Sequence, residues 1–151
     1  MSKSEFYKDR ILWRVNKHKL FKKRCLEYSE LSQMQIRRIQ AFELQGIPIL
    51  AFWKHENQWT ILTSVEVLSF YDGMVFRINL DEIEKHIEIQ VDETAEKPKF
   101  STEFIYLGQD KIKIWVFAGE ELFALYNTLR MFPLNYTGYP VGGNKSVAST
   151  L

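Results

Sequence analysis

The chain has 151 residues and a formal net charge of +1, with 46% hydrophobic and 26% charged residues, which predicts one soluble globular domain. The single cysteine, Cys25, excludes an internal disulfide framework and fits a reducing compartment. No apolar run approaches the roughly 18 residues of a membrane span, and the opening MSKSEFYKDR lacks the apolar core of a signal peptide, so we expect a cytoplasmic protein.

Positive and negative charges are unevenly distributed along the chain. Residues 1–46 hold eleven Lys or Arg against five Asp or Glu, whereas residues 47–151 hold nine against fourteen. The two parts therefore have opposite electrostatic character.

The N-terminal part is predicted to be helical. Ser2 and Glu5 have the S-x-x-E spacing of a capping box, which predicts that a helix begins near Ser4. No helix-breaking residue interrupts the run through Tyr28, so we expect one long or bent helix around residues 5–28.

A second helix is predicted over residues 33–44. Ser32 and Gln35 repeat the capping signature as S-x-x-Q, and Gly46 is a suitable residue just beyond the end of the helix. The alternative is that residues 40–44 already form a strand, which would pair through a turn at Gly46.

From Ile47 onward the pattern changes to short β-strands. The dipeptide Asp72-Gly73 is the strongest hairpin signal in the chain. Residues 92–99 (DETAEKPK) are polar and include Pro98, which predicts an exposed loop. The expected strands are residues 49–53, 59–63, 65–71, 74–80, 81–91, 100–107 and 111–117, with a turn at Gly108-Gln109-Asp110 before the last.

The last strand is expected to lead directly into an amphipathic helix. Gly119 ends the strand, and Glu120 and Glu121 place negative charge where a helix N-terminus favours it. Arg130 suits the last turn, and Pro133 stops the helix. The apolar stripe of this helix consists of Leu122, Leu125, Tyr126, Leu129 and Phe132.

Together these elements predict an α+β protein. We expect an antiparallel, seven-stranded barrel or sandwich whose open end is capped by the C-terminal helix, with Leu122, Leu125 and Leu129 facing the interior. The predicted parts are a helical N-terminal extension over residues 1–46, the barrel and its capping helix over residues 47–132, and an irregular tail over residues 133–151.

Over residues 47–132, the order of elements resembles the pleckstrin-homology-like superfamily, in particular its small bacterial members. The resemblance rests on residues 59–63 (WTILT), the Asp72-Gly73 turn, residues 79–83 (NLDEI) and the strand–helix unit that ends in Leu129. It implies a scaffold that binds phosphoinositides, peptides or proteins, usually without catalysis. The loop that lipid-binding members use is matched by residues 54–58 (KHENQ), with one lysine and one glutamate, whereas a phosphoinositide headgroup needs several cations at once.

The sequence contains no catalytic or metal-binding constellation. His18, His55 and His86 are far apart and lack a second ligand at metal-site spacing, and His86 beside Glu82 is more typical of a surface residue than of a ligand pair. No base is identifiable near Cys25, so we expect a buried structural thiol. There is no G-x-S-x-G motif, phosphate-binding glycine loop or dinucleotide fingerprint. We therefore expect no enzymatic activity, no cofactor and no metal.

A basic cluster, defined as Lys19, Lys22, Lys23 and Arg24, lies in the predicted first helix. It could meet phosphates, anionic lipid or an acidic protein. The alternative is a solvated helix face that docks against the protein's own acidic region. A net charge of +1 argues against nucleic-acid binding, and the absence of a clean apolar face opposite the cluster weakens membrane binding.

An acidic segment, residues 81–96, follows the predicted hairpin. One interpretation is that it improves solubility and protects an edge strand. The other is a docking surface for a basic protein, such as a nuclease toxin whose active site it would block after rapid electrostatic association. Its seven acids are Asp81, Glu82, Glu84, Glu88, Asp92, Glu93 and Glu96.

These observations predict a protein that recognises a protein partner without catalysis, most concretely an immunity protein that neutralises a basic bacterial toxin. The support is the small size, the lack of a catalytic constellation and the two oppositely charged regions. The alternative is a peripheral membrane module that binds anionic lipid through the basic cluster, and no nucleic-acid partner is expected.

Overall fold

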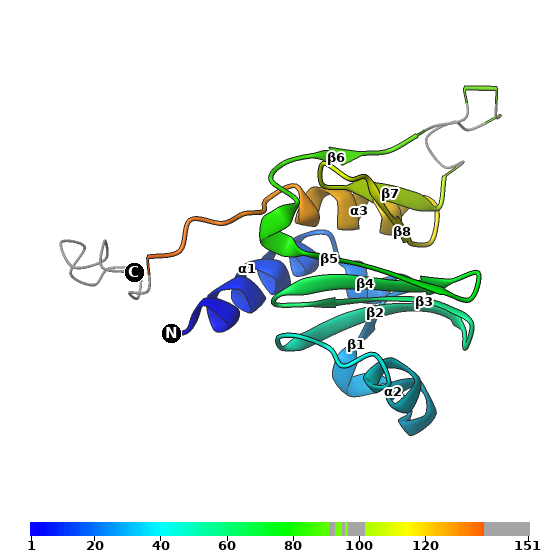
Figure 1. The fold of residues 1–151 in the computed structure, drawn as a ribbon, viewed down its shortest axis with the longest axis horizontal. Coiled ribbons are helices and arrows are strands. Elements are labelled where there is room, and N and C mark those ends of the chain that lie inside the picture. Colours follow the sequence, from blue (N-terminus) through cyan, green and yellow to red (C-terminus); the bar gives the residue numbers. More distant parts are fainter. Residues whose placement is uncertain (91–92, 95, 97–101, 138–151) are drawn as a thin grey trace.

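The computed structural model describes residues 1–90, 93–94, 96 and 102–137 and shows an α+β protein built from two antiparallel sheets (Figure 1). The helices are α1 (Lys3–Lys17), α2 (Gln33–Gln40) and α3 (Glu120–Leu129). The five-stranded sheet has β1 (Leu26–Glu27), β2 (Pro48–His55), β3 (Gln58–Thr63), β4 (Glu66–Tyr71) and β5 (Met74–Asn79) in that order. The three-stranded sheet has β6 (Ile87–Glu88), β7 (Phe104–Leu107) and β8 (Ile112–Trp115). Short 3-10 turns lie at Leu20–Lys22, Tyr28–Glu30 and Leu80–Glu82.

The five-stranded sheet separates two hydrophobic layers. Figure 1 shows the three-stranded sheet and α3 on one side of it and α2 on the other. The central strands are therefore covered on both faces, and their alternating side chains are apolar in both directions. Leu50 and Phe52 of β2 pack into the main core with α1 and α3, whereas Ala51 packs with Trp59 and Ile39 beneath α2.

Local signals in the sequence produce the meander from β2 to β5. Asp72 and Gly73 have φ angles of 52° and 71°, the pair of positive values that a two-residue type I′ hairpin turn requires. The predicted hairpin is confirmed, with Tyr71 opposite Met74.

A buried polar network joins the two sheets. The hydroxyl groups of Thr60 on β3 and Ser69 on β4 lie 2.7 Å apart. Thr60 donates to the carbonyl of Trp115 on β8 at 2.5 Å, and the Trp115 amide donates to Ser69 at 3.0 Å. Because these groups are excluded from water, their mutual hydrogen bonds fix how the sheets are placed.

Helix α3 closes the main core, as predicted. Leu122, Leu125 and Leu129 are at most 1% exposed and pack with Ile11 and Val15 of α1. The α+β class, the antiparallel pairing and the C-terminal helix are confirmed. The strands form two sheets that are not closed into a barrel.

The prediction of a helix over residues 5–28 is wrong beyond Lys17. The capping box of Ser2 and Glu5 is present and α1 begins at Lys3, but His18 caps its end and Lys19 adopts a left-handed conformation with φ of 53°. The chain then turns because Cys25 is buried in the core and β1 pairs with β2, which adds a strand to the sheet.

The second helix is shorter than predicted. Its capping box of Ser32 and Gln35 is present, but α2 ends at Gln40, and residues 41–46 form neither a helix nor the alternative strand. Gly46 does not terminate the helix. It has φ of 84° and lies so close to the link between β3 and β4 that a Cβ atom would be 2.7 Å from Cγ2 of Val65.

The expected strand at residues 81–91 is wrong over most of its length. Leu80–Glu82 forms a 3-10 turn, Glu84 and Lys85 form a second turn, and only β6 is extended. The strand expected at residues 100–107 begins at Phe104 in the structure. Residues 91–92, 95, 97–101 and 138–151, which include most of the predicted loop at 92–99 and most of the predicted tail, lie outside the described residues.

Residues 133–137 belong to no helix or strand. Within the described part of the chain, none of the helices combines the length and apolar character required to cross a membrane.

Candidate functional site

A polar cleft of about 560 Å³ runs along the edge strand β5 and is lined by two of the sequence-predicted acids, Glu82 and Glu84. Figure 1 shows where β5 and the turn that joins β7 to β8 lie, and the cleft is lined by residues of both. We call it the intersheet cleft. Its lining residues are Gln45, Glu66, Arg77, Ile78, Asn79, Glu82, Glu84, Gly108, Gln109, Asp110 and Ile112.

An ion pair between Glu66 and Arg77 forms one wall of the intersheet cleft. Arg77 donates Nε–H to one carboxylate oxygen of Glu66 at 2.8 Å and Nη2–H to the other at 2.7 Å. The backbone amide of Gln45 adds a third hydrogen bond to Glu66 at 2.7 Å. The Glu66 side chain is only 4% exposed, and its hydrogen bonds hold the pKa of the Arg77 guanidinium above its ordinary value.

The opposite wall contains a turn with an unusual backbone. Glu84 and Lys85 have φ angles of 49° and 65°, and the His86 amide closes the turn by donating to the carbonyl of Ile83 at 2.8 Å. Lys85 is bound to the end of α3, since its Nζ donates to the Met131 carbonyl at 2.7 Å. Left-handed conformations cost about 1–2 kcal/mol per residue without glycine. The surrounding hydrogen bonds therefore hold Glu84 in a position that the free chain would avoid.

Gly108 allows the β7–β8 turn to approach this wall closely. Its φ is 77°, and a Cβ atom there would lie 2.7 Å from Cδ1 of Ile78 and 3.3 Å from the carbonyl oxygen of Glu82. The Gly108 amide donates to the His86 carbonyl at 2.8 Å. Glycine adopts this conformation without strain and leaves room for Ile78 and the Glu82 carbonyl, and Asp110 of the same turn lines the cleft together with Glu82.

The intersheet cleft carries uncompensated negative charge. Glu66 is neutralised by Arg77, but within the described ranges no ion pair joins Glu82, Glu84 or Asp110 to a cation. The neighbouring Lys111 instead lies 3.6 Å from Glu88. Glu82, Glu84 and Asp110 are exposed and together give the cleft a negative surface, so the arrangement favours a cationic ligand.

The predicted acidic segment is divided by the fold. Glu82 and Glu84 line the cleft, whereas Asp81 accepts hydrogen bonds from Lys3 and from the hydroxyl of Tyr7 and thereby anchors α1. Burial, together with the hydrogen bond to Asp81, raises the pKa of Tyr7. The remaining acids lie apart from the cleft: Glu88 pairs with Lys111, Glu93 and Glu96 are exposed, and Asp92 lies outside the described residues.

Glu66 and Asp110 were missed as site residues at the sequence level. A signal for Glu66 existed, because a two-residue turn at Asp72-Gly73 places Glu66 diagonally across the hairpin from Arg77. No comparable local signal existed for Asp110, since its position depends on the packing of one sheet against the other.

The basic cluster does not lie in the first helix as predicted, because α1 ends at Lys17. Lys23 forms an ion pair with Glu120 at 2.6 Å, and Arg24 forms one with Glu121 at 2.6 Å, so two of its four cations bind the N-terminus of α3. Lys19 and Lys22 have no ion pair in the part of the chain that the structure describes. The predicted docking against the protein's own acids therefore occurs, but onto α3 rather than the acidic segment.

The predicted burial of Cys25 is confirmed. The residue is 2% exposed, and burial raises the pKa of its thiol, with a further contribution from the charge of Glu121. Both effects disfavour the reactive thiolate. Among the residues described, no three His, Cys, Asp or Glu side chains gather closely enough to hold a metal ion.

Comparisons of this chain with protein-family models, with curated proteins and with solved structures found no match.

Proposed function

We propose that this chain is a non-catalytic protein-binding module that recognises a basic partner through the intersheet cleft. The observation that carries the proposal is the placement of Glu82, Glu84 and Asp110 around one cleft without a neutralising cation in the described ranges. The ion pair between the buried Glu66 and the partly exposed Arg77 gives this surface a rigid wall.

The arrangement suits several cationic side chains better than one small ligand. The lining carboxylates come from separate turns, so they are spread along the cleft rather than directed at one point. Several lysine and arginine side chains on the surface of one protein can each pair with one of these separated carboxylates. The negative potential of the cleft would speed the association of that protein.

The most concrete form of this function is an immunity protein that neutralises a basic bacterial toxin. The pleckstrin-homology-like architecture proposed for residues 47–132 is supported by the order of the elements, a β2–β5 meander followed by β6–β8 and α3. That architecture presents partner-binding surfaces around a stable core.

The alternative, anionic-lipid binding through the basic cluster, has less support. Lys23 and Arg24 are held in ion pairs with α3, which leaves Lys19 and Lys22 as the only members without such a pair among the described residues. Each cation near an anionic membrane contributes about 1 kcal/mol, so two cations provide weak attachment.

The site can be tested with an octalysine peptide as the probe. In nuclear magnetic resonance titrations at low ionic strength, we expect the amide signals of Glu82, Glu84 and residues 108–110 to shift, because the cleft potential attracts the peptide. The variant Glu82→Gln/Glu84→Gln/Asp110→Asn should lose these shifts. Shifts confined to Glu93 and Glu96, or shifts that persist in the variant, would refute the cleft as the recognition site.

A further inference from the structure

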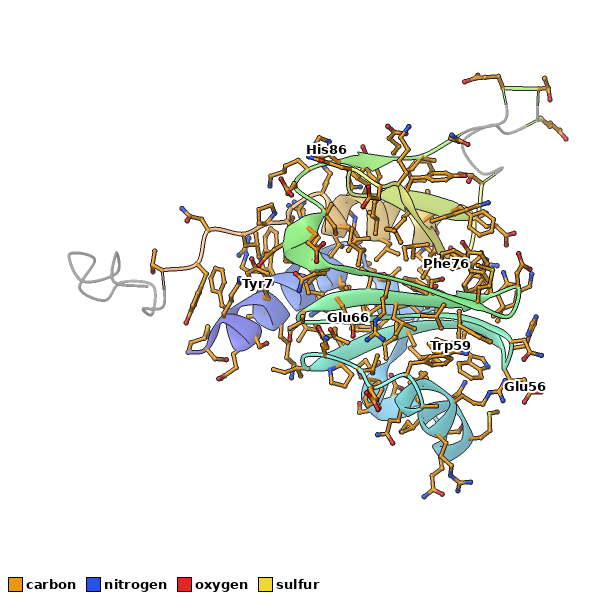
Figure 2. The ribbon with its side chains drawn as sticks, viewed as in Figure 1. Tyr7, Glu56, Trp59, Glu66, Phe76 and His86 are labelled. Atoms are coloured by element: carbon orange, nitrogen blue, oxygen red, sulfur yellow. The ribbon has the colours of Figure 1, made fainter. Side chains whose placement is uncertain are left out.

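A second, apolar pocket lies on the opposite face of the five-stranded sheet from the main core. It has a volume of about 270 Å³ and is formed where the end of α2 meets β3 and β4. Figure 2 shows Trp59 on the α2 side of this sheet. We call it the aromatic pocket. It is lined by Arg37, Arg38, Ala41, Phe42, Trp59 and Phe70.

The aromatic rings of this pocket are held in place by the sheet register. Trp53, Trp59 and Phe70 lie opposite one another on β2, β3 and β4. The Trp59 ring is stacked on Trp53 at 6.1 Å and on Phe70 at 5.7 Å, and Phe42 packs at 5.6 Å from Trp59 and 5.4 Å from Phe70. The rings therefore form a preorganised apolar surface of the kind on which another ring can stack.

Two polar groups at the aromatic pocket lack partners within the described residues. Trp59 is 1% exposed, and its indole N–H is buried without an acceptor. This nitrogen is sealed from solvent, so a ligand in the open pocket cannot reach it, and the exposed Arg37 is the polar group available to such a ligand. Arg38 donates to the Glu56 carbonyl and to Asn57, whereas no hydrogen bond or ion pair to the Arg37 guanidinium is present among the described residues.

We propose that the aromatic pocket binds a small aromatic carboxylate, with its ring against Phe42, Trp59 and Phe70 and its carboxylate paired with Arg37. The volume of about 270 Å³ is below the roughly 300–1,000 Å³ of sites for drug-sized ligands, so the pocket suits a small ligand. Planar guanidinium groups bind carboxylates through two parallel hydrogen bonds, which explains the choice of an acid over a neutral ring. This site lies on a different face from the intersheet cleft and does not depend on the proposed function.

The experiment uses phenylacetate as the probe and phenylacetamide as its uncharged match. The four tryptophans give four indole N–H signals in a proton–nitrogen correlation spectrum, and the variant Trp59→Phe identifies the signal of Trp59. Because ligands of this size bind weakly, the full chain is titrated with phenylacetate to about 20 mM. The Trp59 signal should shift and reach a plateau over this range. Phenylacetamide should bind at least about fivefold more weakly because it lacks the charge that Arg37 recognises.

Three variants make the test specific. Arg37→Gln should weaken phenylacetate binding about fivefold, whereas Arg10→Gln, which removes the same charge from α1, should leave it unchanged. Ala41→Phe places a ring at the mouth of the pocket from an exposed position and should abolish binding without removing core contacts.

Two results would overturn the proposal. The first is the absence of a saturable shift of the Trp59 signal, or an equal shift with phenylacetamide or in Arg37→Gln. The second is a shift that depends on protein concentration alone and accompanies dimer formation in sedimentation, which would assign the pocket to a second copy of the chain.

Discussion

Arg77 binds Glu66 through two parallel hydrogen bonds of 2.8 Å and 2.7 Å at the edge of the intersheet cleft. The Glu66 side chain is 4% exposed whereas the Arg77 side chain is 36% exposed. Loss of the ion pair would therefore leave the charge of Glu66 buried without a partner, whereas water could still solvate Arg77. This difference has a measurable consequence for stability.

Replacing Arg77 with Gln should destabilise the protein by about 2–3 kcal/mol, because it leaves the buried charge of Glu66 without its partner. Replacing both residues with Gln should cost less than the sum of the single changes, since the uncompensated charge is also removed. Urea unfolding of the two single variants and the double variant measures this coupling. Additive effects would show that the pair makes no joint contribution.

Truncation of the α3 stripe tests how the main core is closed. Leu125→Ala should destabilise the protein by about 2–5 kcal/mol, because Leu125 is 1% exposed and its removal leaves a cavity. Met74→Ala is the control, at a side chain that is 57% exposed, and should change stability by less than about 0.5 kcal/mol. Similar urea midpoints for the two variants would contradict the packing of α3.

Gly108 and Gly73 form a matched pair that separates backbone strain from close approach. Both have positive φ angles, but a Cβ atom at Gly73 meets nothing within 4 Å, whereas at Gly108 it would be 2.7 Å from Ile78. Gly73→Ala should cost about 1 kcal/mol and Gly108→Ala about 1 kcal/mol more. Equal losses of unfolding free energy would mean that the β7–β8 turn does not approach Ile78 as described.

The ion pair between Arg24 and Glu121 predicts a specific dependence on pH. Burial raises the pKa of the Glu121 carboxyl, but hydrogen bonds from the Arg24 side chain and from backbone amides lower it by more, so the folded pKa lies below the ordinary value of 4.5. The contribution of this carboxylate is therefore present above about pH 4.5 and is lost as the pH falls through the folded pKa.

Glu121→Gln should destabilise the protein at pH 7 by about 1–2 kcal/mol, and the difference from the natural chain should shrink as the pH falls from about 5 to 3. Urea unfolding across this pH range provides the measurement. The control Glu88→Gln, at an exposed ion pair, should change stability by less than about 0.5 kcal/mol at pH 7. A Glu121→Gln difference that stays constant with pH would contradict the assignment.

Local sequence signals predicted the elements whose structure depends on neighbouring residues. The capping box of Ser2 and Glu5, the turn at Asp72-Gly73 and the burial of Leu125 all follow from spacing within a few positions. The helix predicted through Tyr28 failed for the opposite reason. Arg24 is bound to Glu121, which is 97 positions away, and no local pattern reports such a contact.

The same distinction applies to the candidate site. Glu82 and Glu84 were predicted because they belong to a dense run of acids. The sequence did not show that the other acids of this run would lie outside the cleft. Asp110 joins them only because Gly108 permits one sheet to approach the other. Composition can therefore indicate a charged surface, but the packing of the two sheets decides which charges share a cleft.

The most direct test of the account compares partner capture by three forms of the full chain from a lysate of its source cells. The cleft variant is Glu82→Gln/Glu84→Gln/Asp110→Asn. The control variant Glu88→Gln/Glu93→Gln/Glu96→Gln removes the same number of negative charges, but outside the cleft. We predict that the natural chain and the control variant retain the same basic protein and that the cleft variant loses it. Retention of that protein by the cleft variant, or its equal loss from the control variant, would contradict recognition through the intersheet cleft.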